Sequence, residues 1–190
     1  IGLVDPERFG IMPGRFTVAG FEEIVGSEGG DVILGTPRRD RLFGGDGDDE
    51  IVGRGARDRI LGGAGRDVLR GGRGSDEVGG GAGADRIFGG AGADEIDGGA
   101  GRDLLRGGPG GDRFVLFTLP GAGRAGPPDR ILDFDAGEGD RLLAVVRDPE
   151  RAIVSVAAER GGSVVTVDGA QVELAGVRAR DVDLDWILLV

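Results

Sequence analysis

Aspartate recurs every nine residues through the middle of the chain, always at the same place in a repeating unit. Ten aspartates share this spacing: Asp31, Asp40, Asp49, Asp58, Asp67, Asp76, Asp85, Asp94, Asp103 and Asp112. Glycine-rich turns precede most of them, and glycine lets carbonyl oxygens approach closely because it has no Cβ. Short carboxylates beside clustered carbonyls make an all-oxygen environment, which hard cations such as Ca²⁺ require. The spacing therefore predicts a series of Ca²⁺ sites.

The elements that position these aspartates follow from the nine-residue unit, which runs ten times without insertion over residues 26–115. Position 1 is always Gly, position 6 is always Asp and position 8 is always apolar. Each unit predicts a six-residue turn followed by a three-residue strand. Position 8 then points inward while positions 7 and 9 point outward, because strand side chains alternate. A helix is excluded by the density of glycine.

The turns supply further candidate ligands, because positions 2 and 4 are both glycine in seven repeats. The candidate metal-binding glycines are Gly45, Gly47, Gly63, Gly65, Gly72, Gly74, Gly81, Gly83, Gly90, Gly92, Gly99 and Gly101. Without metal, aspartates stacked at a strand spacing of about 4.8 Å repel by about 3–4 kcal/mol per neighbouring pair. One inward side chain per repeat cannot offset the backbone entropy of ordering. The metal-free chain is therefore expected to be largely disordered, and Ca²⁺ binding to drive folding.

Composition excludes several functional classes. The chain has a formal net charge of −11, which argues against nucleic acid and anionic membranes as partners. His and Cys are absent, so His-based triads, HExxH zinc sites and disulfides are excluded. No catalytic constellation is visible, and the chain is not expected to be an enzyme. There is no apolar run long enough for a membrane span, and residues 1–25 do not read as a cleavable signal peptide.

The flanking segments differ from the repeats and suggest three parts. Residues 1–25 are read as an N-terminal cap or linker, 26–115 as the ten-repeat roll and 116–190 as a C-terminal capping β region. Three strands are predicted in the last part, at 152–158, 163–168 and 170–175, with hairpin turns at Gly161-Gly162 and Asp168-Gly169. The predicted fold is all-β, an elongated parallel β-roll with a small antiparallel cap.

The repeats resemble those of the RTX (repeats-in-toxin) family of secreted bacterial proteins, whose G-G-x-G-x-D-x-U-x unit is a known Ca²⁺-binding β-helix signature. Residues 21–27 (FEEIVGS) resemble the lead-in of such arrays, and Asp129-x-Ile-x-Asp133-Phe134 resembles the segment that follows them in serralysin-type peptidases. The resemblance implies several bound Ca²⁺ ions, an extracellular location and export by type I secretion machinery with an uncleaved C-terminal signal. Asp129 and Asp133 are additional candidate ligands, although both could be turn formers or solvated charges.

In the family, two repeats make one turn of the roll and each Ca²⁺ lies between repeats n and n+2. Carried over here, odd and even repeats form two edges with at most four sites each. Repeat two has Thr36, Pro37 and Arg38 in its loop, and repeat four has Arg54 and Ala56. We therefore expect the site between repeats two and four to be lost and the site between four and six to be weak. The odd edge should hold the tighter run.

Four position-9 residues in the early repeats are apolar where the outer surface should be polar: Leu34, Phe43, Val52 and Leu61. We interpret them as covered by residues 1–25. At the other end, the Trp186–Val190 run fits both a secretion signal and a last core strand.

Two simpler interpretations of the repeats are a flexible glycine-rich linker and a metal-free solenoid. A linker would not hold Asp and an apolar residue in fixed phase, and a complete Asp column exceeds what turn formation needs. Three functional settings stay open for the predicted Ca²⁺-dependent roll. It could be a stand-alone secreted calcium-binding protein, the C-terminal module of a larger secreted peptidase, lipase or epimerase, or part of an adhesin.

Overall fold

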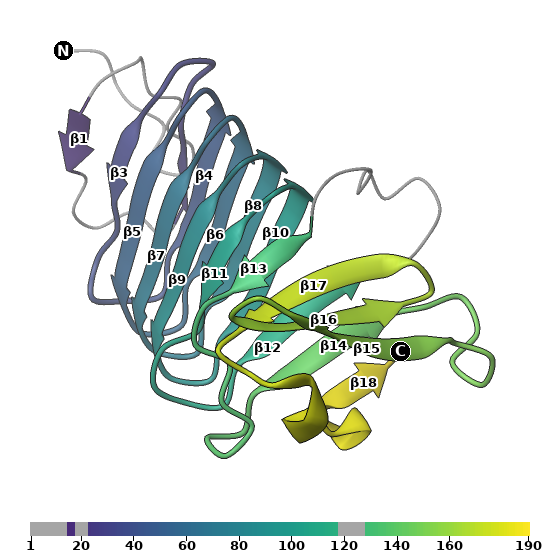
Figure 1. Ribbon diagram of the computed structural model, residues 1–190. Helices are drawn as coiled ribbons and strands as arrows, with labels where there is room; N and C mark the ends of the chain where they lie inside the picture. Colours follow the sequence, from purple (N-terminus) through teal and green to yellow (C-terminus); the bar gives the residue numbers. More distant parts are fainter. Residues whose placement is uncertain (1–14, 18–22, 118–127) are drawn as a thin grey trace, which may run out of the picture.

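The computed structural model describes residues 15–17, 23–117 and 128–190, and these residues form two β-sheets that lie face to face (Figure 1). The chain alternates between the sheets, so that neighbouring strands within a sheet come from every second repeat. Two repeats therefore make one turn, and the ten repeats form a stack of about five turns. The predicted all-β parallel roll is confirmed.

One sheet has ten strands. Their order is β1 (Arg15–Thr17), β3 (Val32–Leu34), β5 (Glu50–Gly55), β7 (Val68–Arg73), β9 (Arg86–Ala91), β11 (Leu104–Arg106), β13 (Asp129–Ile131), β17 (Ala170–Ala175), β16 (Gly162–Val167) and β15 (Val154–Glu159). It is parallel from β1 to β17, because each strand pairs with the strand one full turn away.

The second sheet has eight strands, all parallel to their neighbours. Their order is β18 (Ile187–Leu189), β14 (Arg141–Val145), β12 (Arg113–Phe117), β10 (Glu95–Gly101), β8 (Glu77–Gly83), β6 (Arg59–Ala64), β4 (Arg41–Asp46) and β2 (Glu23–Val25). The 18-residue register is uniform within the array, as in Leu42 opposite Ile60 and Ile60 opposite Val78. Position 8 of each repeat thus stacks on position 8 of the repeat two units away.

The strands are longer than the three residues predicted for each repeat. Most continue through the next two to four residues, so that β6 runs from Arg59 through Gly62 and Gly63 to Ala64. The first glycines of each turn therefore belong to the parallel ladder, with Gly63 in register with Gly45 and Gly81. This close stacking of turn backbones is possible because a Cβ on Gly63 would overlap the carbonyl group of Gly45.

The core consists of inward side chains stacked along both sheets and packed between them. All ten position-8 residues are buried: Ile33, Leu42, Ile51, Ile60, Leu69, Val78, Ile87, Ile96, Leu105 and Phe114. Ile24 of β2 extends this core before the first repeat, and Ile131 and Leu142 extend it after the last, in register with Leu105 and Phe114. The roll therefore runs on beyond the nonapeptide array in both directions.

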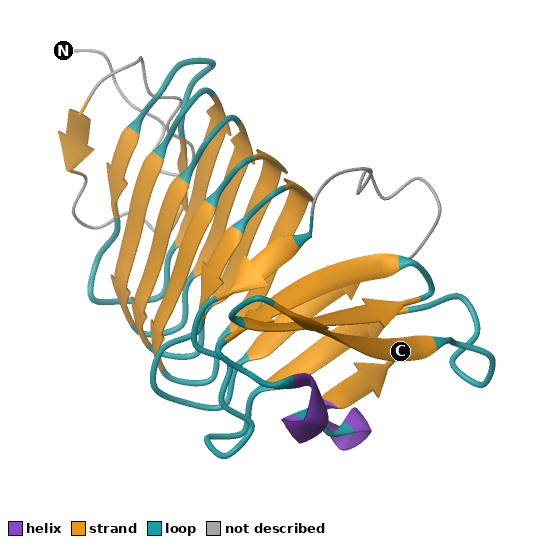
Figure 2. Ribbon diagram, in the orientation of Figure 1, coloured by secondary structure: helices purple, strands orange, loops and turns teal. Residues whose placement is uncertain are grey.

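The C-terminal region continues both sheets. The three predicted strands appear as β15, β16 and β17, which form two antiparallel hairpins, and β17 attaches to β13 of the roll. Asp168 and Gly169 have φ values of 47° and 89°, as a two-residue hairpin turn requires. Two short 3-10 helices, Ala179–Asp181 and Leu184–Trp186, precede β18 and are the only helical segments of the described residues (Figure 2).

The C-terminal run forms a core strand, as one of its two interpretations expected. Ile187 of β18 is buried and in register with Leu142, and Trp186 packs on Phe134 with ring centroids 5.7 Å apart. Phe134 in turn lies 6.1 Å from Phe114 of the last repeat. These contacts anchor the cap to the end of the roll.

The apolar position-9 residues of the early repeats lie on the outer faces and are half-buried. The segment predicted to cover them, residues 1–25, lies largely outside the described residues. Within its described part, β1 and β2 add one strand to each sheet. The described part of the chain contains no helix that could span a bilayer.

Candidate metal centre

The position-6 aspartates lie where each turn becomes a strand, and all ten are buried. The 18-residue register stacks them in two files, one on each edge of the roll. The odd file contains Asp31, Asp49, Asp67, Asp85 and Asp103, and the even file contains Asp40, Asp58, Asp76, Asp94 and Asp112. The predicted arrangement of odd and even repeats on two edges is confirmed.

Each file is held by one repeated hydrogen bond. The backbone N–H of an aspartate donates to Oδ1 of the aspartate one rung later, as Asp49 does to Asp67 at 2.9 Å and Asp58 to Asp76 at 2.7 Å. This bond fixes the orientation of the carboxylate, because one oxygen is committed to the neighbouring rung. The other oxygen, Oδ2, is left to face the turn of its own repeat.

In the interior of the files, that second oxygen has no hydrogen-bond donor. Among the described residues, Oδ2 is buried and unbonded in Asp49, Asp58, Asp67, Asp76, Asp85, Asp94 and Asp112. Buried polar atoms are normally satisfied, and an unsatisfied carboxylate oxygen carries a large desolvation penalty. A whole column of such atoms indicates a positively charged partner that the protein alone does not provide.

A backbone carbonyl faces the same space as most of these oxygens. At Gly53, a Cβ would meet Oδ2 of Asp58 and would lie 2.7 Å from the carbonyl oxygen of Gly71. The same overlap recurs at position 1 of the later repeats, for example at Gly71, whose Cβ would meet Oδ2 of Asp76 at 2.5 Å and also the Gly89 carbonyl. Position 1 is always glycine because any side chain would fill the space between the two acceptors.

The rest of each turn is shaped by glycines in the left-handed region. Positions 2 and 4 have positive φ in every repeat from the third to the tenth. Twelve of these residues are the predicted metal-binding glycines, Gly45, Gly47, Gly63, Gly65, Gly72, Gly74, Gly81, Gly83, Gly90, Gly92, Gly99 and Gly101. In repeat four, Arg54 and Ala56 adopt the same conformation, with φ values of 84° and 68°, although L side chains are strained there. The turn of repeat four therefore keeps the shape of its neighbours.

Burial changes the acid–base behaviour of the interior carboxylates. Loss of solvation, together with neighbouring carboxylates, raises the pKa of Asp58 and of Asp112 from 3.8 to about 7. The same cause raises the pKa of Asp49, Asp85 and Asp94 to about 6. The hydrogen bond from the preceding rung lowers each pKa in part. Without a cation, the ionised file is therefore electrostatically unfavourable.

These features fit a hard divalent cation. The available groups are carboxylate and carbonyl oxygens, which are the ligands that Ca²⁺ prefers. Among the described residues, no three acidic side chains converge on one point, so a cation in a file must draw on main-chain carbonyls as well as on aspartates. The glycine turns place such carbonyls beside Oδ2.

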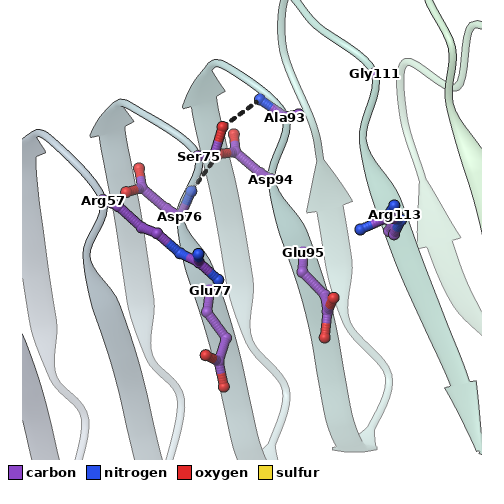
Figure 3. Close-up of a pocket in the computed structure, with 9 residues that line it drawn as sticks. All are labelled: Arg57, Ser75, Asp76, Glu77, Ala93, Asp94, Glu95, Gly111 and Arg113. Atoms are coloured by element: carbon purple, nitrogen blue, oxygen red, sulfur yellow. Dashed lines mark hydrogen bonds between the residues drawn. The ribbon is translucent and has the colours of Figure 1, made fainter.

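The even file is reached from solvent through a hollow of about 420 Å³ (Figure 3). Asp76 and Asp94 line it, and so do the small position-5 residues Ser75, Ala93 and Gly111. Because these side chains are small, the hollow provides access to the turns of repeats six, eight and ten.

The segment after the repeats extends both files. The amide of Asp103 donates to Oδ1 of Asp129 at 3.0 Å, and the amide of Asp112 donates to Oδ1 of Asp140 at 2.8 Å. Asp129, a predicted ligand, thus takes the next place in the odd file. Asp140 takes the next place in the even file and was missed by the sequence reading. The signal was present, since Asp140-Arg-Leu-Leu and Asp129-Arg-Ile-Leu match positions 6–9 of a repeat, as in Asp58-Arg-Ile-Leu.

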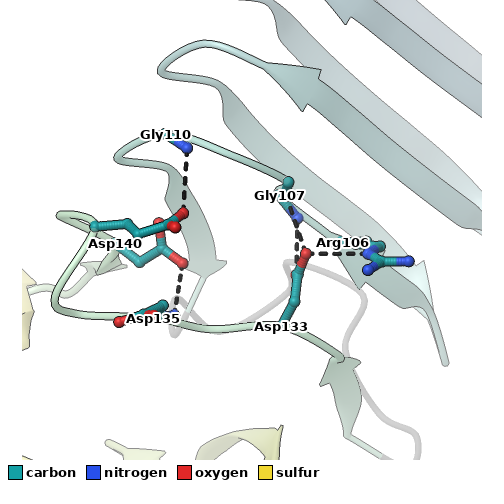
Figure 4. Close-up of polar contacts among 8 residues, drawn as sticks. Arg106, Gly107, Gly110, Asp133, Asp135 and Asp140 are labelled. Carbon is teal, nitrogen blue, oxygen red and sulfur yellow. Dashed lines mark hydrogen bonds and ion pairs between the residues drawn. The ribbon is translucent and has the colours of Figure 1, made fainter.

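Asp133, the other predicted ligand, lies outside the files. Its carboxylate accepts hydrogen bonds from the amides of Gly107 and Gly108 and from Arg106 Nε, at 3.0–3.1 Å (Figure 4). Both oxygens are therefore engaged in joining the last repeat to the segment that follows. In this structure Asp133 acts as an anchor of the turn of repeat ten.

The repeats match those of a known protein family. The family of RTX calcium-binding nonapeptide repeats (4 copies) matches residues 25–60, 52–87 and 79–114. Among solved structures, the extracellular lipase LipA from Serratia marcescens is 19% identical with a TM-score of 0.48, over 95% of this chain and 40% of the lipase chain. The AlgE6R3 subunit of the Azotobacter vinelandii mannuronan C5-epimerase is 26% identical with a TM-score of 0.28, over 86% of this chain and 80% of that subunit.

A search of curated protein sequences finds no match. This chain spans less than half the length of the Serratia lipase. The family match covers the entire Asp ladder up to Asp112. Residues 25–114 therefore belong to the family of RTX calcium-binding nonapeptide repeats, which form a β-roll that binds several Ca²⁺ ions and has a structural rather than a catalytic role.

Proposed function

We propose that this chain is a secreted calcium-responsive module that stays unfolded in the low-calcium cytosol and folds on Ca²⁺ binding after export. The observation that carries the proposal is the column of buried, unbonded Oδ2 atoms, which face carbonyl oxygens across the glycine turns. The carboxylate oxygens and the carbonyl oxygens are both hydrogen-bond acceptors and repel each other. They stay close together only if cations lie between them. The free energy of metal binding is then part of the free energy of folding.

The interior aspartates are the proposed ligands, with the turn glycines contributing main-chain carbonyls. The cation would neutralise carboxylates whose raised pKa values show that burial penalises the ionised form. If free Ca²⁺ stands at ten times the dissociation constant of a site, that site adds about 1.4 kcal/mol to folding. Several sites acting together would switch the roll between states over a narrow range of Ca²⁺ concentration.

The proposed division of labour follows the three parts of the sequence. Residues 26–115 bind Ca²⁺, residues 1–25 form an N-terminal cap or linker, and residues 116–190 cap the last turn of the roll and carry the signal read by type I secretion machinery. The continuous core from Phe114 through Phe134 to Trp186 supports a folding role for the C-terminal region. In the folded state the terminal strand β18 is part of the sheet, so a secretion signal there would be read before folding.

The test is a Ca²⁺ titration of EDTA-treated protein, followed by far-UV circular dichroism, with Mg²⁺ as control. We expect a cooperative gain of β signal with Ca²⁺ alone, at high micromolar to millimolar concentrations. A spectrum that is already β-rich in EDTA and indifferent to Ca²⁺ would rule out folding driven by the metal. For export, deletion of residues 187–190 should abolish secretion from a host that has the type I machinery and leave synthesis unchanged.

A further inference from the structure

The first carboxylate of each file is bonded differently from those in the interior. Oδ2 of Asp31 accepts hydrogen bonds from the amide of Ser27 at 2.7 Å and from its hydroxyl at 2.9 Å. Oδ2 of Asp40 accepts from the amide of Thr36 at 2.5 Å, and the Thr36 hydroxyl donates to Oδ1 at 3.1 Å. In both rungs, donors from the protein occupy the oxygen that is unbonded further along.

The cause lies at position 2 of the repeat. Ser27 and Thr36 are the residues at position 2 in repeats one and two, where most later repeats have glycine. Neither has the positive φ that position 2 adopts in every repeat from the third onward. Their amides therefore turn toward the aspartate four residues ahead, and their hydroxyls can reach the same carboxylate. This is the local side-chain and backbone bonding that Ser, Thr and Asp favour in turns.

The far end of the even file is closed by a similar bond. Oδ2 of Asp140 accepts a hydrogen bond from the amide of Asp135, five residues earlier, at 2.8 Å (Figure 4). An amide from the turn thus satisfies the last carboxylate just as Thr36 satisfies the first. The carboxylates with an unbonded Oδ2 in this file lie between these two ends.

Arginine side chains also gather on the even edge near Asp40. Arg39 and Arg41 flank it, and together with Arg57 and Arg59 they line a hollow of about 190 Å³ on the even edge. At position 5, the turns of repeats two and four therefore present the guanidinium groups of Arg39 and Arg57, where the later turns on this edge have Ser75, Ala93 and Gly111.

We propose that Ser27 and Thr36 take the place of the cation at the first rung of each file, so that Asp31 and Asp40 end the ladder without binding Ca²⁺. The inference rests on the proposed calcium function of the interior rungs. The amide of Ser27 or Thr36 lies on the side of Oδ2 that faces the turn of the same repeat. A cation therefore cannot contact Oδ2 from that side. On each edge, this closes the first of the four gaps between successive repeats.

The first test counts the ions bound to the full chain by native mass spectrometry at saturating Ca²⁺. Asp31→Asn and Asp40→Asn should bind as many ions as the unaltered chain. The matched interior variants Asp67→Asn and Asp76→Asn should each lose at least one. Loss of an ion from Asp31→Asn or Asp40→Asn, as large as in the interior variants, would overturn the inference and leave calcium binding itself intact.

The second test adds a site. Ser27→Gly turns residues 26–31 into a complete G-G-x-G-x-D turn, because Gly29 is already at position 4. We expect this variant to bind one more Ca²⁺ ion than the unaltered chain. Ser75→Gly, a change of the same type at position 5 of repeat six, should leave the count unchanged. If Ser27→Gly binds no more Ca²⁺ ions than the unaltered chain, Ser27 does not take the place of a cation.

The two proposals fail in different ways. If the unaltered chain and all variants bind no Ca²⁺, the proposed function is wrong and the inference falls with it. If interior variants lose ions and end variants do so equally, only the inference is wrong. Circular dichroism at saturating Ca²⁺ identifies any variant that has not folded, and the Ser27→Gly arm then decides independently of the aspartate variants.

Discussion

The amide of Asp112 donates to Oδ1 of Asp140 at 2.8 Å, although the two residues are 28 positions apart and only Asp112 belongs to a nonapeptide repeat. The same bond joins Asp94 to Asp112 at 2.9 Å across the regular 18-residue step. The files of aspartates are thus a property of the roll and continue beyond the repetitive sequence. Asp140 accepts two amides, from Asp112 and Asp135, and closes the even edge.

Removing this closing carboxylate should destabilise the end of the roll. Asp140→Ala leaves two amides without their acceptor, and each unsatisfied buried donor costs about 1–3 kcal/mol. We expect the free energy of unfolding in saturating Ca²⁺ to fall by about 2–5 kcal/mol, measured by urea denaturation. Asp185→Ala, at an exposed position in the same region, is the control and should change it by less than about 0.5 kcal/mol. Equal effects of the two changes would contradict this role of Asp140.

Position 1 of the repeats should not tolerate a side chain. Gly71→Ala places a Cβ 2.5 Å from Oδ2 of Asp76 and in collision with the Gly89 carbonyl, so it fills the space proposed for the cation. We expect a several-fold higher Ca²⁺ midpoint in the circular dichroism titration and the loss of at least one ion. Gly55→Ala is the matched control, because its Cβ would have no atom nearer than 3.9 Å and its φ is not positive. A Gly71→Ala variant that titrates like Gly55→Ala would disprove this placement of the sites.

Substitutions in the strained turn of repeat four should stabilise the roll. Arg54 and Ala56 have φ values of 84° and 68°, which cost L residues about 1–2 kcal/mol each. Arg54→Gly with Ala56→Gly should stabilise the Ca²⁺-bound roll by about 1 kcal/mol net, because the greater freedom of glycine in the unfolded chain offsets part of the gain. Chemical denaturation measures this, with Ala82→Gly, at an exposed position without positive φ, as the control that should destabilise slightly. Destabilisation by the double change would show that the turn is not strained.

Because of the raised pKa values, the metal-free roll should be more stable at low pH than at high pH. Burial raises the pKa values of Asp58 and Asp112 from the usual 3.8 to about 7 in the folded state, so the folded state binds protons more tightly than the unfolded state. Their contribution to stability is fully present below about pH 3.8 and is lost as the pH rises through about 7. In EDTA, we therefore expect more β signal near pH 4.5 than at pH 8.

With Ca²⁺ present the trend should reverse, because protons compete with the metal for the same carboxylates. The Ca²⁺ midpoint should rise as the pH falls from 8 to 5.5, and the circular dichroism titration at each pH measures it. A metal-free spectrum with more structure at pH 8 than at pH 4.5 would show that the carboxylates are not buried together without metal.

The sequence by itself determined the roll, its core and the position of the aspartates. A nine-residue period has glycine at position 1, Asp at position 6 and an apolar residue at position 8. It predicts a roll in which equivalent positions stack on two edges. The 18-residue step places Ile60 in register with Leu42 and Asp76 one rung after Asp58. The hairpins of the C-terminal region were also predictable, because Asp168-Gly169 specifies a two-residue turn.

The tertiary structure alone decided which carboxylate oxygens are already satisfied. The sequence shows identical aspartates in all ten repeats, and only the fold shows that Ser27 and Thr36 bond Asp31 and Asp40 while Oδ2 of Asp67 and Asp76 stays unbonded. It also decided that Asp140 joins a file and Asp133 does not. The intervening loops have irregular lengths, so the register of these residues depends on the pairing of β13 and β14 with the roll rather than on spacing along the chain.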